Sequence, residues 1–294
     1  MFPQAVRAVR ELKPKAFIFE NVRGLLRPCF RNYVEFVRLQ LTFPDFPISS
    51  NLDWETNLRR LERHQTSTRI PSESEYDVTI NLANATDYGV PQKRHRVFFV
   101  GFKRDTNARW FFPAPSHNRL ALQHAQWATG EYWRDHGIKV PAEISRPAKV
   151  PEVEDLFEPC RRWRTVRDAI AGLGEPNINR IEDSHWPQSG ARSYPGHTGS
   201  PIDEPAKALK AGDHGVPGGE NMMRLPDDSI RYFTVRESAR IQTFPDDWRF
   251  EGSWSESMRQ LGNAVPVNLG RIVAESVASA LRSRKSAARV QSAR

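Results

Sequence analysis

Two groups of side chains in this sequence have the character of a catalytic or binding site, and the first is a single carboxylate. Glu20 follows the apolar run Ala16–Phe19, which is typical of a buried parallel strand. Ligands of an open α/β sheet bind just beyond the carboxyl ends of its strands, so Glu20 stands at a position suited to a catalytic acid. The alternative is an acid at a strand end that caps the following helix.

The second group is the basic segment from Gly89 to Arg96, which reads Gly-Val-Pro-Gln-Lys-Arg-His-Arg. Its glycine and proline predict a turn between two strands, which we expect over residues 76–82 and 96–101. Arg94 and Arg96 at the mouth of a sheet would clamp a phosphate or a base. A solvated basic loop is the alternative interpretation.

The segments around these residues predict an α/β domain. Apolar residues recur at helical spacing from residue 2 to residue 12, and a Lys-Pro pair ends the pattern. Residues 30–41 and 54–65 predict two further helices. Glu20 would therefore lie in a sheet that these helices cover.

Residues 104–229 have a different composition. Pro, Gly, Trp and His are frequent there, turn signals are dense and periodicity is weak. Such a long irregular region is either functional or disordered, and its five Trp residues argue against disorder. We therefore predict a second, loop-rich domain.

Regular structure resumes near residue 230. Thr234 and Glu237 have the spacing of a capping box and predict a helix through Gln242. A tight loop at 261–266 leads into a final helix, and the basic, Ser- and Ala-rich tail 282–294 is expected to be disordered.

Composition suggests a polyanionic partner and excludes several classes of protein. The 294 residues carry a net charge of +8, and Arg far outnumbers Lys. Arg suits contacts to phosphates and base edges, although a coding bias would give the same excess. No apolar stretch is long enough for a membrane span, no secretory signal is present, and two Cys without a CxxC pair give neither a disulfide framework nor a metal site. We expect a cytoplasmic protein without metal.

Four segments, in order, resemble the later motifs of the DNA cytosine-5 methyltransferases. The irregular stretch lies where that family places its target-recognition domain, and the resemblance covers roughly residues 1–281. The four segments are Phe-Glu-Asn-Val at 19–22, Gly-Val-Pro-Gln-Lys-Arg-His-Arg at 89–96, Thr-Val-Arg-Glu-Ser-Ala-Arg-Ile-Gln-Thr-Phe-Pro-Asp at 234–246 and Gly-Asn-Ala-Val-Pro at 262–266.

The resemblance implies a role for each residue in methyl transfer from S-adenosylmethionine to cytosine C5. In the family, a Cys thiolate adds to C6 of a cytosine that has left the duplex. Glu20 matches the carboxyl group at N3, which needs a raised pKa, as burial would provide. Arg96 matches the arginine at O2, and Arg94 matches one at the backbone of the flipped nucleotide. Asn263 and Val265 match the loop beside the cofactor's methionine moiety.

The same resemblance gives candidate contacts to double-stranded DNA. For Arg236, Glu237 and Arg240 we favour bracing of the recognition domain against the catalytic domain, with phosphate contact as the alternative. The target sequence cannot be read, because it depends on which side chains reach base edges. The candidates are Gln92, Arg236, Arg240, Lys210 and His214, with Arg192 and His197 also in the recognition stretch.

The family's N-terminal motifs are absent from the sequence. No Asp-x-Phe-x-Gly-x-Gly loop and no Pro-Cys-Gln segment precede Glu20. Cys29 is no substitute, because it follows Glu20 and lacks the Gln, and Cys160 lies in the recognition stretch. About 80–100 residues of strand–helix units would be missing, so the cofactor site is expected to be incomplete.

We therefore expect a partial, Rossmann-like methyltransferase sheet with a smaller loop-rich recognition domain. A miscalled start, a frameshift or a separate N-terminal subunit would each explain the missing half. An unpaired strand edge would make the chain poorly soluble or oligomeric. The predicted boundaries are 1–103 for the catalytic part, 104–229 for the recognition domain, 230–281 for the return to the catalytic part and 282–294 for the tail.

Two other functions remain open from the sequence. The first is a non-catalytic, sequence-specific DNA-binding remnant that keeps the recognition domain. The second is an unrelated Arg-rich nucleic-acid protein whose motifs arose by chance. Retention of Glu20 and Arg96 favours the enzyme, because a binding module needs no pocket for a flipped base.

Overall fold

The computed structural model describes residues 2–67, 74–140, 161–180, 183–211 and 219–292. The chain divides into two compact units. Unit 1 contains Met1–Ala83, His95–Pro113 and Val273–Arg294, and unit 2 contains Asn84–Arg94 and Ala114–Ile272. The division places the first part of the basic segment in unit 2 and its last two residues in unit 1.

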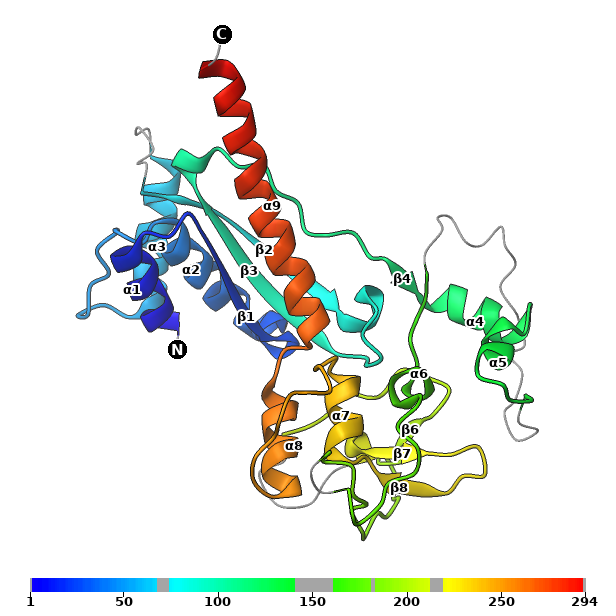
Figure 1. Cartoon of the computed structure of the whole chain (residues 1–294). Helices are drawn as coiled ribbons and strands as arrows, with labels where there is room; N and C mark the ends of the chain where they lie inside the picture. Colours follow the sequence, from blue (N-terminus) through cyan, green and yellow to red (C-terminus); the bar gives the residue numbers. More distant parts are fainter. Residues whose placement is uncertain (1, 68–73, 141–160, 181–182, 212–218, 293–294) are drawn as a thin grey trace. The chain divides into compact units, whose positions relative to one another are not determined.

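Unit 1 is built on a three-stranded sheet in the order β1-β3-β2 (Figure 1). The strands are β1 (Ala16–Val22), β2 (Tyr76–Asn84) and β3 (His95–Lys103). Seven consecutive residues in the middle of β3 are buried, as the central strand requires. β1 is an edge strand of this sheet in the described part of the chain.

The direction of β1 differs from the sequence prediction. β1 pairs antiparallel with β3, and Glu20 lies opposite Phe98 inside the strand rather than at its end. The apolar run Ala16–Phe19 was typical of a parallel strand, but apolar residues report burial and not the direction of the neighbouring strand. Glu20 is therefore positioned by the sheet ladder and does not cap a helix.

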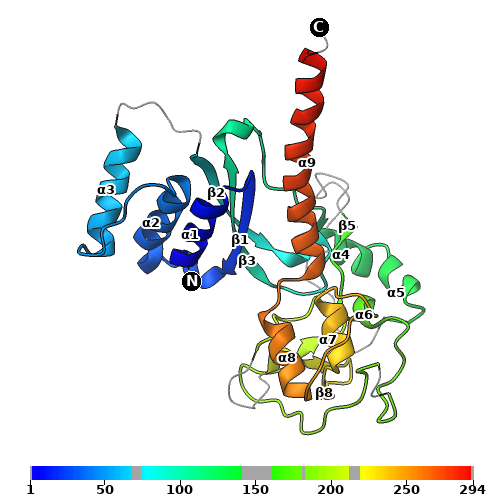
Figure 2. The same cartoon turned by 60° about the vertical axis from the view of Figure 1, so that its left-hand side comes forward.

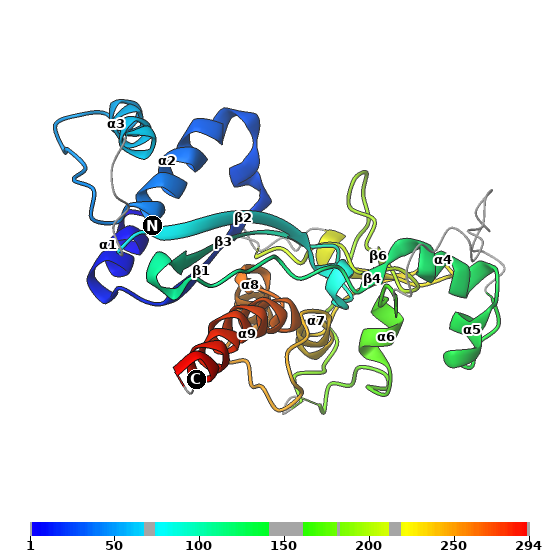
Figure 3. The same ribbon diagram turned by 90° about the horizontal axis from the view of Figure 1, so that it is seen from above.

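Helices cover both faces of this sheet. In Figures 2 and 3, α1 and α2 lie on one face and the C-terminal part of α9 lies on the other. Val6, Val9 and Val37 pack with Phe17 and Phe99 of the sheet to form a core. The helices are α1 (Phe2–Leu12), α2 (Arg31–Thr42), α3 (Trp54–Thr66) and α9 (Val267–Ser292), with 3-10 turns at Arg23–Leu26, Pro28–Phe30 and Arg104–Thr106.

The C-terminal helix is longer than the sequence predicts. α9 continues through Ser292, so residues 282–292 are helical where we expect a disordered tail. The tail is rich in Ala and Arg, which have high helix propensity. The prediction of disorder relied on charge and low hydrophobicity. Neither property prevents the continuation of a helix that is already nucleated.

Unit 2 contains short elements joined by long connections. A two-stranded parallel sheet pairs β4 with β5, and a three-stranded sheet has the order β6-β7-β8. The helices are α4 (Arg119–Trp127), α5 (Glu131–Asp135), α6 (Val166–Ile170), α7 (Val235–Ile241) and α8 (Trp254–Asn263). The strands are β4 (His117–Asn118), β5 (Arg161–Arg162), β6 (Ser200–Pro201), β7 (Met222–Arg224) and β8 (Ile230–Tyr232), with 3-10 turns at Ala85–Tyr88 and Gly219–Asn221.

Side-chain caps fix the start of several helices in unit 2. The predicted capping box of Thr234 and Glu237 is confirmed at the start of α7. Two more capping boxes open α6, with Thr165, and α8, with Ser253. Each box satisfies backbone N–H groups at a helix start, which suits helices too short to be stable by themselves.

Candidate functional site

Glu20 and Arg96 form an ion pair across two neighbouring strands of unit 1. Val22 lies opposite Arg96 in the β1–β3 ladder, and Glu20 is two residues before Val22, so the two side chains share a face of the sheet. Long side chains on such a diagonal reach each other. Arg96 Nε lies 2.5 Å from Glu20 Oε1. The sequence indicated both residues but not that they bind each other.

The environment of this pair is asymmetric. The side chain of Arg96 is 10% exposed and that of Glu20 is 25% exposed. Burial lowers the pKa of the Arg96 guanidinium, and the charge and hydrogen bonding of Glu20 raise it. Because Glu20 keeps the greater exposure, a small polar ligand would meet the carboxylate first.

Arg94 lies in unit 2, where its guanidinium binds backbone carbonyls. It donates to Leu209 O at 2.9 Å and Ala264 O at 3.0 Å, and also to Gly262 O. The residue is 2% exposed. Arg94 therefore joins the basic segment to the Gly-Asn-Ala-Val-Pro loop, a contact between two of the sequence motifs.

Gln92 helps to hold the same region. Its side-chain oxygen accepts from the backbone N–H of Leu209 at 3.1 Å, and it is fully buried. The neighbouring backbone N–H of Lys93 donates to Ala206 O at 2.7 Å. In this structure Gln92 is thus a structural residue and presents no exposed group to DNA.

Asn263 and Val265 lie where α8 ends and α9 begins. Asn263 is exposed, and in the described part of the chain no hydrogen bond engages its side-chain amide. Val265 is half-buried. An amide that binds polar groups beside an apolar side chain suits an amino-acid moiety with a thioether stem, so these two residues fit the methionine end of S-adenosylmethionine.

Arg236 and Arg240 on α7 make extensive contacts inside unit 2. Arg236 is 2% exposed and donates to three backbone carbonyls, those of Asp183, Pro245 and Trp248. Arg240 makes two hydrogen bonds to the carboxylate of Asp246, at 2.8 and 2.6 Å. Both residues thus brace unit 2 internally, and a DNA contact stays a prediction.

Lys210 is more accessible than Gln92, Arg236 and Arg240. Its side chain is 56% exposed, and Nζ lies 2.9 Å from Glu220 Oε1. His214 and Cys160 lie outside the described residues. Cys29 is exposed in the 3-10 turn Pro28–Phe30, after β1 in the chain, as the sequence implies.

Sequence reasoning missed one buried carboxylate of unit 2. Asp203 is 5% exposed, accepts from Tyr132 Oη at 2.8 Å and pairs with Arg167 Nε at 2.6 Å. Its partners lie 71 and 36 residues away in the chain, so no local pattern marks it. This network joins α5 and α6 to the loop after β6.

Gly262 lets the motif loop pack closely against its neighbour, which yields a testable prediction. A Cβ at Gly262 would lie 2.3 Å from the backbone N of Ala211, and backbone cannot swing aside. Gly262→Ala should therefore destabilise unit 2 by about 1–3 kcal/mol, although Ala favours a helix. Urea unfolding followed by circular dichroism measures the change.

The matched control for this change is Gly270→Ala. A Cβ at Gly270 meets its nearest neighbour at 3.9 Å, which is ordinary contact. Ala is then expected to stabilise α9 by up to about 1 kcal/mol. Equal effects of the two substitutions would contradict the close packing at Gly262.

The described residues show neither a cluster of metal ligands nor a membrane-spanning helix. Within residues that the structure places, no group of three or more His, Cys, Asp or Glu could hold a metal ion. None of the described helices is long and apolar enough to cross a membrane.

The sequence is similar to a family model and to curated proteins that are both described as DNA methyltransferases. A family model described as C-5 cytosine-specific DNA methylase matches residues 1–52 and 58–279. The type II methyltransferase M.Eco47II from Escherichia coli is 27% identical over 286 residues, covering 94% of this chain and 57% of the relative. M.NgoFVII from Neisseria gonorrhoeae is 29% identical over 266 residues, covering 90% of this chain and 59% of the relative.

A solved structure shares the fold. A DNA modification methyltransferase encoded within an E. coli prophage matches with a TM-score of 0.50 and 18% identity, covering 94% of this chain and 72% of that chain. At this identity the likeness shows an α/β methyltransferase fold and no more. The chain spans less than three fifths of the length of the two curated relatives, which are covered to 57% and 59%.

Proposed function

The chain belongs to the C-5 cytosine-specific DNA methylase family, and from this premise we propose that it supplies part of an S-adenosylmethionine-dependent DNA cytosine-5 methyltransferase. The substrate is a cytosine within a specific duplex site, in a type II restriction–modification system like those of the relatives. The ion pair of Glu20 and Arg96 is the observation that carries the proposal.

The pair suits one edge of a cytosine ring. N3 and O2 are adjacent on that edge, so a carboxyl group and a guanidinium in contact with each other can bind both atoms together. The target base has to leave the duplex to reach them. Arg96 would bind O2 and stabilise the negative charge that develops there, while Glu20 would hold a proton at N3.

Substrate binding has to change the protonation of this pair. An arginine beside a carboxylate favours the ionised carboxylate, which cannot donate a proton. When cytosine O2 takes over part of the Arg96 guanidinium, that stabilisation of the anion weakens and protonated Glu20 becomes accessible. In this proposal Arg96 thus influences the protonation of Glu20 and also binds cytosine O2.

Asn263 and Val265 would bind the methionine end of S-adenosylmethionine. The bound cofactor supplies the methyl group, and the two residues orient it through an amide and an apolar contact. Lys210 and Arg240 are two of the predicted DNA contacts that keep exposure, so we retain them as phosphate or base contacts. Gln92 and Arg236 are buried, so we do not assign them a direct DNA contact.

The remaining chemistry would come from parts of the family's domain that these 294 residues do not contain. No Pro-Cys-Gln segment stands before Glu20, and the chain covers 57% of M.Eco47II. Those parts would supply the thiolate nucleophile and the rest of the cofactor site. Without a nucleophile, non-catalytic DNA binding is the alternative function.

Methyl transfer from labelled S-adenosylmethionine to duplex DNA tests the proposal. We expect no transfer by the 294 residues alone, because they contain no Pro-Cys-Gln nucleophile, and transfer to one cytosine C5, located by bisulfite sequencing, when a polypeptide that carries the missing motifs is present. Transfer by the 294 residues alone would contradict this dependence on a further nucleophile. Methylation at adenine or at cytosine N4 by the complete enzyme would contradict the proposed reaction.

A further inference from the structure

Gln242 and Thr243, at the C-terminal end of α7, hold both ends of the loop at 262–266. Before the loop, the Gln242 side-chain amide donates from Nε2 to Leu261 O at 2.7 Å. After the loop, the backbone N–H of Val267 donates to Gln242 O at 3.0 Å. All of these residues belong to unit 2. The end of α7 is therefore bonded to the loop on both sides.

The hydroxyl of Thr243 completes this attachment. Its Oγ1 accepts a hydrogen bond from the backbone N–H of Asn268 at 2.8 Å and donates to Gln242 O at 2.7 Å. The N–H groups in the first turn of a helix have no partner within the helix, and Pro266, which precedes α9, has no side-chain oxygen to cap them. Thr243 thus supplies, from α7, a cap that the residue before α9 lacks.

The backbone of Thr243 adopts a conformation that is rare for threonine. Its φ is 59°, in the left-handed region, where a β-branched residue is strained. The N–H of Thr243 donates to Arg240 O and that of Phe244 to Ala239 O, both at 2.9 Å, which is the Schellman pattern that glycine usually ends. Glycine would make the same turn without strain. The end of α7 therefore does not explain why this residue has a side chain.

Gln242 carries a second locally unfavourable feature. Its side chain is fully buried, yet in the described part of the chain Oε1 has no hydrogen-bond partner. A buried acceptor without a donor is destabilising, and a leucine of similar size would avoid it. Leucine could not donate to Leu261 O, however. Two consecutive residues thus keep unfavourable features, and the side chains of both bond to the ends of the same loop, a combination typical of functional sites.

We propose that Gln242 and Thr243 are positioning residues for S-adenosylmethionine, acting through the loop that carries Asn263 and Val265. They fix the carbonyl before the loop and the first two N–H groups after it. The Asn263 amide and the Val265 side chain are then ordered before the methionine end of the cofactor binds, which reduces the entropy lost on binding. The inference rests on the proposed function, because that function assigns the loop to the cofactor.

Thr243→Gly distinguishes this role from a merely structural one. The substitution removes the strain and the hydroxyl together, so the urea midpoint should change little. The dissociation constant of S-adenosylmethionine, measured by calorimetry on the native assembly, should rise about three- to tenfold, as expected for one lost hydrogen bond. Hydrogen exchange of the Asn268 amide, measured without cofactor, should become faster.

Two further variants test the groups that the proposal uses. Thr243→Ser keeps the hydroxyl and removes the β-branch, so affinity and slow exchange at Asn268 should both be retained. Gln242→Leu removes the donor to Leu261 O and the unpaired buried acceptor together. It should weaken cofactor binding about as much as Thr243→Gly without lowering the urea midpoint.

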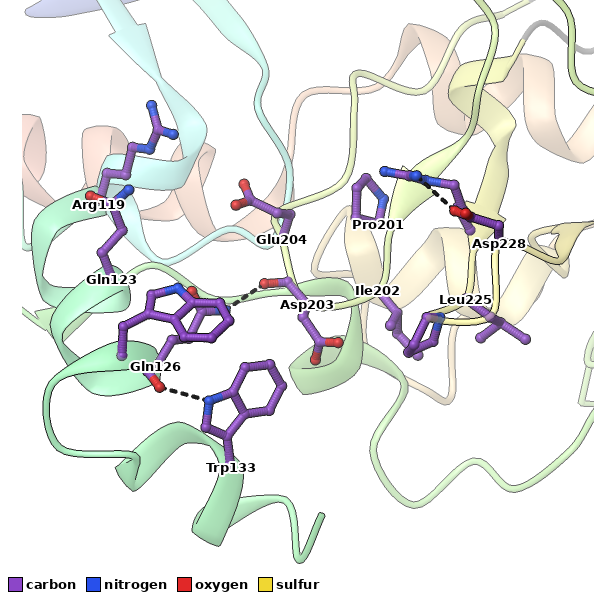
Figure 4. Close-up of a pocket in the computed structure, with 13 residues that line it drawn as sticks. Arg119, Gln123, Gln126, Trp133, Pro201, Ile202, Asp203, Glu204, Leu225 and Asp228 are labelled. Atoms are coloured by element: carbon purple, nitrogen blue, oxygen red, sulfur yellow. Dashed lines mark hydrogen bonds and ion pairs between the residues drawn. The ribbon is translucent and has the colours of Figure 1, made fainter. Parts of the chain in front are cut away.

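Asp228→Gly and Gln126→Leu are the matched controls. Asp228 also lies in the left-handed region, with φ 63°, and pairs with Arg224 (Figure 4). Gln126 is also a buried glutamine, and its Nε2 donates to Asp203 O at 2.8 Å (Figure 4). Both controls line a cavity of about 450 Å³ between α4 and the β6–β7 region. Neither is hydrogen-bonded to residues 261–268 in the described structure, so cofactor affinity should be unchanged.

The possible failures are distinguishable. Unchanged affinity and exchange in Thr243→Gly, or equal losses in Thr243→Gly and Thr243→Ser, would overturn this inference and leave the proposed function standing. A urea midpoint that falls in parallel with the affinity would make Thr243 a structural residue only. Failure of the unaltered assembly to bind S-adenosylmethionine would overturn the proposed function and this inference with it.

Discussion

Glu20→Gln is expected to lower methyl transfer by the complete enzyme by about 10²- to 10⁴-fold, the usual contribution of a positioned acid or base. Glutamine keeps the size of the side chain and its ability to accept a hydrogen bond from Arg96. It cannot carry the proton that the proposed mechanism places at cytosine N3. The loss should therefore appear in the rate of methyl transfer, measured with saturating DNA and S-adenosylmethionine.

The affinity for DNA should change little in this variant. Phosphate contacts supply most of the binding energy of such proteins, and Glu20 is not a cation. Equilibrium binding to the target duplex should stay within about twofold of the unaltered enzyme. A parallel loss of rate and affinity would show that Glu20 binds the base without acting on its proton.

Glu35→Gln is the matched control. Glu35 is also a carboxylate of unit 1 paired with an arginine, Arg38, at 2.6 Å. It lies on α2 and has no proposed role, so full activity is expected. Unchanged activity of Glu20→Gln would remove the acid from the mechanism, and inactivity of the unaltered assembly would favour the DNA-binding remnant.

The sequence predicted the elements of unit 1 better than their arrangement. Periodicity placed helices at 2–12, 30–41 and 54–65, and the structure has them at Phe2–Leu12, Arg31–Thr42 and Trp54–Thr66. These signals are local, since each helix needs one apolar face. The antiparallel pairing of β1 with β3 joins residues about 80 apart, and no local pattern encodes it.

In the candidate site, too, the sequence predicted the residues but not their contacts. Glu20 and Arg96 were identified through their motifs, but their mutual ion pair depends on strand register, which follows only from the folded sheet. Arg94 was grouped with Arg96 because a single residue separates them in the same motif. The structure places Arg94 before β3 begins, and three of its acceptors are backbone carbonyls, which have no signature in a sequence.

Arg94→Ala is expected to destabilise unit 2 by at least about 3 kcal/mol, since each buried carbonyl without a donor costs roughly 1 kcal/mol or more. Three backbone acceptors, on Leu209, Gly262 and Ala264, lie 115 to 170 residues along the chain from Arg94. Urea unfolding should show a lower midpoint. Arg94→Lys should restore only part of the loss, because an ammonium cannot match the guanidinium fork.

Arg271→Ala is the control for the loss of an arginine. Arg271 is exposed on α9 and donates to Asn268 Oδ1 at 2.7 Å, so its removal should change stability by less than about 0.5 kcal/mol. If Arg94→Ala proved as stable as this control but bound DNA weakly, Arg94 would reach the nucleotide backbone, as the family resemblance implies. A large loss of stability would instead make Arg94 the residue that holds the Asn263 and Val265 loop in place, so that its effect on methyl transfer passes through the cofactor.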